Sequence, residues 1–256
     1  MDLAIVEQDA DAPAGVLAEW ARERGHCVET LRARELGTGW PDPARFGAIA
    51  ALGSASSVHA SPGPWIAAEI GFLRAAHDAG VPLLGLCFGG QALAAALGAE
   101  VRLAPRPEIG WLELEPLDGG PVPPGPWFQW HFDTFTVPPG ARLLARSALC
   151  PQAFALGTSV GLQFHPEVKP EIIDGWICTG GEGLARSGVD AQALAAQTRR
   201  AGPGARERAP EPRRAAAPAS ASTSSVAPSR ARHSRARRVG AGRYRDAPTR
   251  ASAALR

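Results

Sequence analysis

The sequence contains few cysteines, and none at a spacing typical of structural metal sites. The four cysteines are Cys27, Cys87, Cys150 and Cys178, and no two of them form a Cys-x-x-Cys pair. No spacing of cysteine and histidine suggests zinc binding, so we expect neither a metal nor another cofactor. The simplest interpretation of these four cysteines is that they are reduced thiols in a cytoplasmic protein.

Long hydrophobic runs are also absent. No stretch of about 18 apolar residues occurs, so the sequence predicts no membrane-spanning helix and no membrane partner. The first ten residues, MDLAIVEQDA, lack a basic segment, and their apolar run is too short for a signal peptide.

Charge is divided unevenly along the 256 residues. Residues 1–199 contain 13 basic and 22 acidic residues, whereas residues 200–256 contain 14 Arg and 3 acidic residues. Residues 206–256 have almost no large aliphatic side chains, so we expect a disordered basic tail. Such a tail could contact nucleic acid or an acidic partner. We favour the interpretation that the tail has no function, for example that it is a product of out-of-frame translation of GC-rich DNA, because Ala, Arg, Pro and Ser dominate it.

The first 98 residues alternate short apolar segments with segments of helical periodicity. This alternation predicts an α/β fold with a doubly wound, mostly parallel sheet and flanking helices. The expected strands are 3–8, 27–31, 46–53 and 81–87. The expected helices are 12–25, 63–80 and 89–98.

After residue 99 the pattern changes to short strands joined by turn-rich segments. The expected strands are 99–104, 110–117, 127–137, 141–147, 152–157 and 160–164, and 170–181 is expected to be a closing helix. We therefore divide the chain into a domain at 1–180, a short helical extension at 181–205 and the basic tail at 206–256.

One cysteine lies where a strand meets a glycine turn. In Pro-Leu-Leu-Gly-Leu-Cys-Phe-Gly-Gly, Cys87 follows an expected strand and precedes an expected helix. Gly85 and Gly89 allow the close packing and unusual torsion angles of a sharp turn. The helix N-terminus beyond it can lower a thiol pKa and bind a developing oxyanion. We therefore interpret Cys87 as a nucleophile, and the other three cysteines as small buried apolar residues.

A nucleophilic thiolate requires a base, and the base requires a group that orients it. His165 ends an apolar strand in Gly-Leu-Gln-Phe-His-Pro-Glu, and Glu167 follows two residues later. That carboxylate can hold one ring nitrogen while the other faces a nucleophile on a neighbouring strand.

These residues resemble the class I (triad) glutamine amidotransferases. Residues 85–91, Gly-Leu-Cys-Phe-Gly-Gly-Gln, match the family's G-x-C-x-G-x-Q motif, and 164–167, Phe-His-Pro-Glu, match its H-P-E motif. The resemblance covers residues 1–180 and implies a flavodoxin-like fold. It also implies a triad of Cys87, His165 and Glu167 that hydrolyses glutamine to glutamate and ammonia through a thioester.

The resemblance also implies an oxyanion hole. The backbone N–H of Phe88, directly after the nucleophile, supplies one half. In the family the other half comes from a glycine-rich loop after the third strand. Here that loop reads Leu-Gly-Ser-Ala-Ser-Ser-Val, with Gly53 and Ser54 in place of the common Gly-Gly-Pro.

Three further residues are implied to bind substrate. Gln91 matches the motif glutamine near the substrate pocket. His131 and Asp133, in Gln-Trp-His-Phe-Asp-Thr-Phe, resemble the family's Ser-His-x-Asp segment, whose backbone holds the α-amino and α-carboxylate groups. Trp130 replaces the usual small residue, and a purely structural role for His131 is an equal alternative.

The resemblance implies L-glutamine as substrate and a partner synthetase that receives the ammonia. Residues 181–256 are too short and too polar to be that synthetase, and the chain has neither a Walker A motif nor a Ser-Gly-Gly-x-Asp-Ser loop. Three alternatives remain: a glutaminase with an unknown acceptor, a γ-glutamyl hydrolase or peptidase on the same fold, and a non-catalytic binding protein.

Overall fold

The computed structural model describes residues 1–60, 63–117 and 122–208. The chain divides into compact units at 1–215 and 216–256, and all described residues lie in the first. The expected disordered tail therefore lies outside the described residues, apart from its first three. Within the described part, no helix is both long and apolar enough to cross a membrane.

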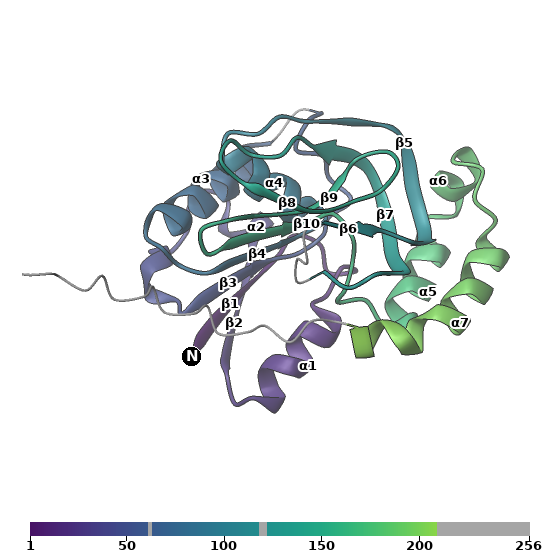
Figure 1. The fold of residues 1–256 in the computed structure, drawn as a ribbon. Coiled ribbons are helices and arrows are strands. Elements are labelled where there is room, and N and C mark those ends of the chain that lie inside the picture. Colours follow the sequence, from purple (N-terminus) through teal and green to yellow (C-terminus); the bar gives the residue numbers. More distant parts are fainter. Residues whose placement is uncertain (61–62, 118–121, 209–256) are drawn as a thin grey trace, which may run out of the picture. The chain divides into compact units, whose positions relative to one another are not determined.

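The main sheet has eight strands in the order β2-β1-β3-β4-β10-β9-β8-β6 (Figure 1). The first five are parallel neighbours, and β9, β8 and β6 continue the sheet in antiparallel pairing. This arrangement confirms the predicted doubly wound, mostly parallel sheet. The strands are β1 (Asp2–Glu7), β2 (Cys27–Arg32), β3 (Ala48–Ala51), β4 (Leu83–Leu86), β6 (Glu115–Pro116), β8 (Arg142–Arg146), β9 (Pro151–Leu156) and β10 (Ser159–Leu162).

A second sheet pairs β5 (Val101–Leu112) with β7 (Trp127–Phe135) in antiparallel register. The prediction of separate strands at 99–104 and 110–117 was wrong, because β5 runs from the first segment into the start of the second, and the short β6 lies in the remainder of the second. Its register shifts between Leu103 and Glu108. Pro105 and Pro107 lie in that interval, and because proline has no N–H for the ladder, the irregularity falls where they occur.

The helices cover both faces of the main sheet and one end of the second. Figure 1 shows α3 and α4 on one side of the main sheet and α1 on the other. The short α2 and η1 were not predicted, because a single turn has no periodicity to detect. The helices are α1 (Gly15–Glu23), α2 (Ala33–Leu36), η1 (Pro43–Arg45), α3 (Pro64–Asp78), α4 (Phe88–Ala96), α5 (Pro170–Thr179), α6 (Gly181–Arg186) and α7 (Ala191–Arg208).

Strand β1 shows why this sheet is buried on both faces. Ala4 and Val6 belong to the core beneath α3 and α4, whereas Leu3 and Ile5 belong to the core on the side of α1. Side chains alternate between the faces of a strand, so a continuous apolar run serves both cores.

The segment that follows α5 packs against the second sheet. Leu194 of α7 is buried in a core with Trp111 and Phe128, and Trp111 Nε1 donates to Thr198 Oγ1 at 3.1 Å. Helix α7 therefore supports β5 and, through it, the neighbouring β7.

Candidate active site

Cys87 occupies a strained turn between β4 and α4. Its φ is 49°, and it is the one non-glycine residue with positive φ in the described part of the chain. Its N–H donates to Leu162 O of β10 at 2.9 Å. Such strain persists only where surrounding structure imposes it, and it is concentrated at functional sites.

Two glycines make this turn possible. A Cβ on Gly85 would lie 2.5 Å from Gly89 O, and a Cβ on Gly89 would lie 2.2 Å from Ala51 O. Both distances are shorter than any real carbon–oxygen contact, so β4, α4 and β3 can approach only without these side chains. The close approach holds Cys87 at the carboxyl edge of the parallel strands, where open α/β sheets bind their ligands.

The thiol lies beside the first turn of α4. Cys87 O accepts from Gln91 N at 2.9 Å, which closes that turn. Phe88 is the first residue of α4, so its N–H has no partner within the helix. A free N–H at the positive end of a helix is suited to bind an oxyanion formed at Cys87.

His165 is held by Glu167 in a fully buried pair. Nδ1 of His165 lies 2.7 Å from Glu167 Oε1, and the backbone N–H of His165 donates to Phe128 O at 2.9 Å. The carboxylate therefore fixes both the tautomer and the orientation of the ring, and leaves Nε2 available for another group.

Gly53 lies against both His165 and Cys87. A Cβ on Gly53 would lie 3.1 Å from His165 Cε1 and 3.8 Å from Cys87 Cβ. The fold thus brings the candidate nucleophile, the candidate base and the loop after β3 together.

The electrostatics of His165 favour a charged ring. Burial lowers its pKa, but the charges of Glu167 and Cys87 and their hydrogen bonds outweigh burial and raise the pKa to about 10. At neutral pH the ring is therefore an imidazolium between a carboxylate and a sulfur that it can stabilise as a thiolate.

Ser54 turns its side chain away from the thiol. Its hydroxyl donates to Asp9 Oδ2 at 2.6 Å, and Ala55 N donates to the same oxygen at 3.0 Å. Burial raises the pKa of Asp9, but hydrogen bonds from Ser54, Arg34 and Ala55 outweigh it and hold the pKa below the usual value. The Ser54 side chain therefore anchors the loop, which leaves its backbone N–H as the group that can face substrate.

Gln91 reaches the second sheet. Its Nε2 lies 3.1 Å from Asp133 O and 3.3 Å from Gln163 Oε1. Gln163 in turn places Nε2 3.8 Å from Cys87 Sγ. Gln91 thus holds the backbone of β7 in place behind the thiol.

The side chains of His131 and Asp133 are both engaged within the protein. His131 Nδ1 donates to Asp133 O at 2.9 Å, and Asp133 Oδ2 accepts from Ser57 Oγ. These contacts join β7 to the loop that carries Gly53. The backbone of this segment faces the thiol, since Trp130 O lies 3.8 Å from Cys87 Sγ.

The structure adds residues that the sequence analysis missed. Gln163 precedes His165 by two positions in a strand-like segment, so alternation could have placed both on one face. The sequence pattern gave no indication of Asp9, Ser57 and Trp176, because they reach the site from separate elements. The ring centroid of Trp176 lies 5.0 Å from that of His165.

The expectation that the other cysteines are buried apolar residues was wrong for two of them. Cys27 and Cys178 are exposed, because β2 is an edge strand and Cys178 lies on the outer side of α5. Cys150 is buried, but its Sγ donates to Glu108 Oε2 at 3.1 Å. Burial raises the pKa of Cys150 to about 11, so this thiol is neutral.

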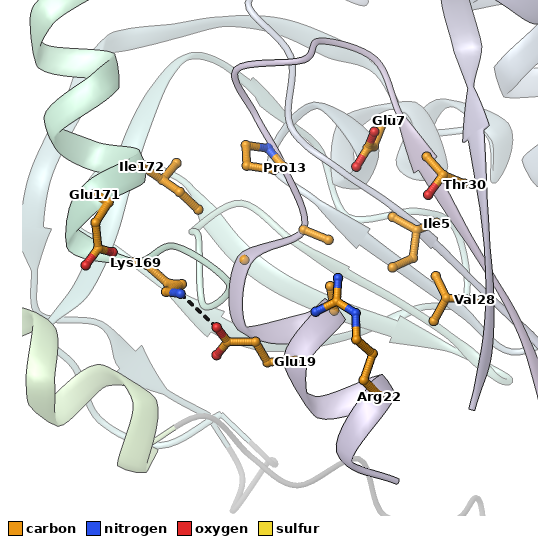
Figure 2. Close-up of a pocket in the computed structure, with 13 residues that line it drawn as sticks. Ile5, Glu7, Pro13, Glu19, Arg22, Val28, Thr30, Lys169, Glu171 and Ile172 are labelled. Atoms are coloured by element: carbon orange, nitrogen blue, oxygen red, sulfur yellow. Dashed lines mark hydrogen bonds and ion pairs between the residues drawn. The ribbon is translucent and has the colours of Figure 1, made fainter. Parts of the chain in front are cut away.

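A pocket of about 370 Å³ lies apart from Cys87 and His165. Figure 2 shows it between α1, β1, β2 and the start of α5, with Lys169 paired to Glu19 at 2.7 Å beside Arg22. It meets the site at Gly15, whose neighbour Val16 donates to Glu167 O at 2.9 Å. The pocket thus borders the loop that carries Glu167 without containing the candidate catalytic groups.

Solved structures of other proteins share this fold. A glutamine amidotransferase from Thermotoga maritima is 26% identical, with a TM-score of 0.69 over 78% of this chain and 90% of that one. A glutamine amidotransferase from Methylobacillus flagellatus is 28% identical, with a TM-score of 0.66 over 71% of this chain and 76% of that one.

Curated relatives match part of the chain. A glutamine-hydrolysing GMP synthase from Aeropyrum pernix is 33% identical over 187 residues, which are 65% of this chain and 36% of that protein. One subunit of a glutamine-hydrolysing GMP synthase from Thermococcus kodakarensis is 36% identical over 34% of this chain and 52% of that relative. The chain thus spans about a third to a half of these relatives.

The family model named "Glutamine amidotransferase class-I" matches residues 48–177, a stretch that begins with β3 and includes Cys87, His165 and Glu167. On this match, together with the strained turn at Cys87 and the fold, the chain belongs to the class I glutamine amidotransferases.

Proposed function

We propose that this protein hydrolyses the side-chain amide of L-glutamine to glutamate and ammonia, with Cys87 as nucleophile, His165 as acid and base, and Glu167 as the group that orients His165. The observation that carries the proposal is the strained turn of Cys87 at the end of β4, beside the buried pair of His165 and Glu167.

The reaction begins with the Cys87 thiolate attacking the amide carbon of glutamine. The N–H of Phe88 and an N–H of the Gly53–Ser54 loop stabilise the resulting oxyanion. Nε2–H of His165 protonates the leaving nitrogen, so that ammonia departs and a γ-glutamyl thioester remains on Cys87. His165 then takes a proton from water, which attacks the thioester; glutamate is released, and the Cys87 thiolate and the protonated His165 are restored.

The substrate's α-amino and α-carboxylate groups bind along the backbone of β7 near Trp130 and Asp133. Gln91 supports this assignment, because its amide holds Asp133 O. The side chain of His131 acts within the protein, which favours the structural alternative for that residue.

The ammonia passes to a separate synthetase. The chain spans only part of its GMP synthase relatives, and the Thermococcus kodakarensis relative is named as one subunit of such an enzyme. These matches support a partner that consumes ammonia in a synthetase reaction, with the amidotransferase as its ammonia source.

Glutamate release from L-glutamine by the purified full chain tests the proposal. We expect release in the unchanged protein and in a Cys178→Ala control, and none in Cys87→Ala. An electrophilic glutamine analogue should add one covalent adduct, located at Cys87 by peptide mass spectrometry.

Two outcomes would favour the alternatives. Cleavage of γ-glutamyl amides or peptides with no release from glutamine would indicate a γ-glutamyl hydrolase. Glutamine binding in calorimetry without turnover, and without an adduct at Cys87, would indicate a non-catalytic binding protein.

A further inference from the structure

A second buried cluster of cysteine, histidine and glutamate lies behind β7. Glu108 of β5, His131 of β7 and Cys150, directly before β9, each place one side-chain ligand atom within 4.8 Å of the other two. All three residues are buried. They come from three strand regions of two different sheets, so the spacing of the sequence could not reveal them.

The ring of His131 directs a lone pair into this cluster. Nδ1 lies 2.9 Å from Asp133 O, and because a carbonyl oxygen only accepts, Nδ1 carries the proton. In the neutral ring Nε2 is then an acceptor. It has no hydrogen-bond partner among the described residues, and it lies 3.3 Å from Glu108 Oε2 while the side chain is 1% exposed.

Glu108 Oε2 accepts from Gln152 Nε2 at 2.7 Å and from Cys150 Sγ at 3.1 Å, but neither donor reaches between this oxygen and Nε2 of His131, where a cation would be favoured. A carboxylate oxygen and an imidazole lone pair repel, and burial strengthens that repulsion. A proton on His131 would satisfy the pair, and so would a metal ion. We favour the metal ion, because the sulfur of Cys150 supplies a third ligand atom within 4.8 Å of the other two.

We propose that Glu108, His131 and Cys150 bind a zinc ion, through one carboxylate oxygen, Nε2 and Sγ. Cysteine, histidine and carboxylate together are the donor set that Zn²⁺ takes in proteins. The fourth position is open to water or to a neighbouring hydroxyl.

The distances between the donor atoms fit such a site. Zn²⁺ binds sulfur at about 2.3 Å and nitrogen or oxygen at about 2.0–2.2 Å, so tetrahedral ligands lie about 3.3–3.6 Å apart. Cys150 Sγ is 3.1 Å and His131 Nε2 is 3.3 Å from Glu108 Oε2. The third distance, between Cys150 Sγ and His131 Nε2, is within 4.8 Å, so these two side chains would close on the ion as it binds.

Binding exchanges a proton for the metal without oxidation or reduction. The S–H bond of Cys150 breaks, its proton leaves to the solvent, and a sulfur–zinc bond forms. The ion would join β5, β7 and the start of β9, and through His131 it would fix the neighbouring Trp130 carbonyl beside Cys87. The ion is therefore structural and holds one wall of the candidate site.

Zinc titration of the full chain, with any affinity tag removed, tests this site. The Cys87→Ser variant must be included, because Cys87, His165 and Glu167 form a second donor set of the same kind. We expect one zinc ion per chain by mass spectrometry in the unchanged protein and in Cys87→Ser. In Cys150→Ser we expect binding at least about 100-fold weaker, because a primary ligand is lost.

A second ligand variant and a spectroscopic readout keep the test decisive. Glu108→Gln should also lose tight binding, whereas the exposed control Cys178→Ser should not. Co²⁺ in place of zinc should give a thiolate charge-transfer band that Cys150→Ser abolishes, with circular dichroism showing that each variant is folded. Zinc that is lost in Cys87→Ser, or that binds equally in Cys150→Ser, would overturn the proposal.

Discussion

The Ser54 hydroxyl donates a 2.6 Å hydrogen bond to Asp9 Oδ2, and this contact joins the loop after β3 to the carboxyl end of β1. The same carboxylate accepts from Ala55 N and pairs with Arg34. The Asp9 side chain therefore holds the loop after β3 in place, although this loop lacks the Gly-Gly-Pro sequence common in the family. We therefore expect the loop to keep its position beside the proposed oxyanion hole only while Asp9 stays charged.

Asp9→Asn should loosen this loop. Because the pKa of Asp9 is lowered in the folded protein, its contribution is present above the ordinary aspartate pKa and is lost as pH falls through the lowered value. We expect a loss of about 1–2 kcal/mol in the free energy of unfolding at pH 7, typical of hydrogen bonds to a charge, and a lower kcat for glutamine. Urea unfolding at pH 7 and pH 3 measures the first effect, and it should shrink at pH 3.

Asp78→Asn is the matched control for that measurement. Asp78 pairs with Arg74 on the exposed face of α3, where ion pairs contribute little. An equal loss of stability in both variants would contradict a special role for Asp9.

Gly53→Ala should impair catalysis more than folding. The added methyl carbon would lie 3.1 Å from His165 Cε1, so the ring must shift relative to Cys87. A misplaced catalytic group can cost about 100-fold in rate, and we expect kcat/KM to fall by at least about 10-fold. Gly71→Ala in α3, where a Cβ meets nothing within 4 Å, should leave kcat/KM unchanged.

Glu167→Gln should lower the pKa of His165. Glu167 is the largest of the influences that raise this pKa to about 10, and an amide carries no charge. The raised pKa stabilises the folded protein fully below pH 6.5, the pKa of an unperturbed histidine, and that stability is lost as pH rises through about 10. NMR titration of the His165 ring should show a lower midpoint in Glu167→Gln. An unchanged midpoint would indicate that Glu167 does not govern the charge of His165.

Glu69→Gln should stabilise the protein at alkaline pH. Glu69 of α3 is fully buried, accepts from Gln8 Nε2 at 2.6 Å, and has a pKa raised by burial to about 8. Stability must therefore fall as pH rises from about 4.5 to 8, because the folded state retains a proton that the unfolded state loses. Glutamine keeps the acceptor oxygen without the charge, so thermal unfolding should show a higher Tm at pH 8.5 but little change at pH 4.5. A Tm that falls equally at both pH values would contradict this interpretation.

The pattern of residues along the chain was sufficient to predict a doubly wound, mostly parallel main sheet and the sharp turn at Cys87, whereas the triad is what the resemblance to the family implies. Short apolar runs alternating with helical periods dictate a parallel sheet covered on both faces, and glycines around Cys87 allow one sharp turn. The motif at His165 places its orienting carboxylate two residues away, which is local information. These features depend on neighbours in the chain, so the sequence contains them.

The surroundings of those residues emerged only from the folded structure. Asp9, Ser57 and Gln163 approach the site from separate elements, and Glu108, His131 and Cys150 meet although 42 residues separate the first from the last. Exposure of Cys27 followed from β2 being an edge strand, which local pattern does not reveal. Long-range packing sets such contacts, because strands adjacent in the sheets are often distant in the sequence.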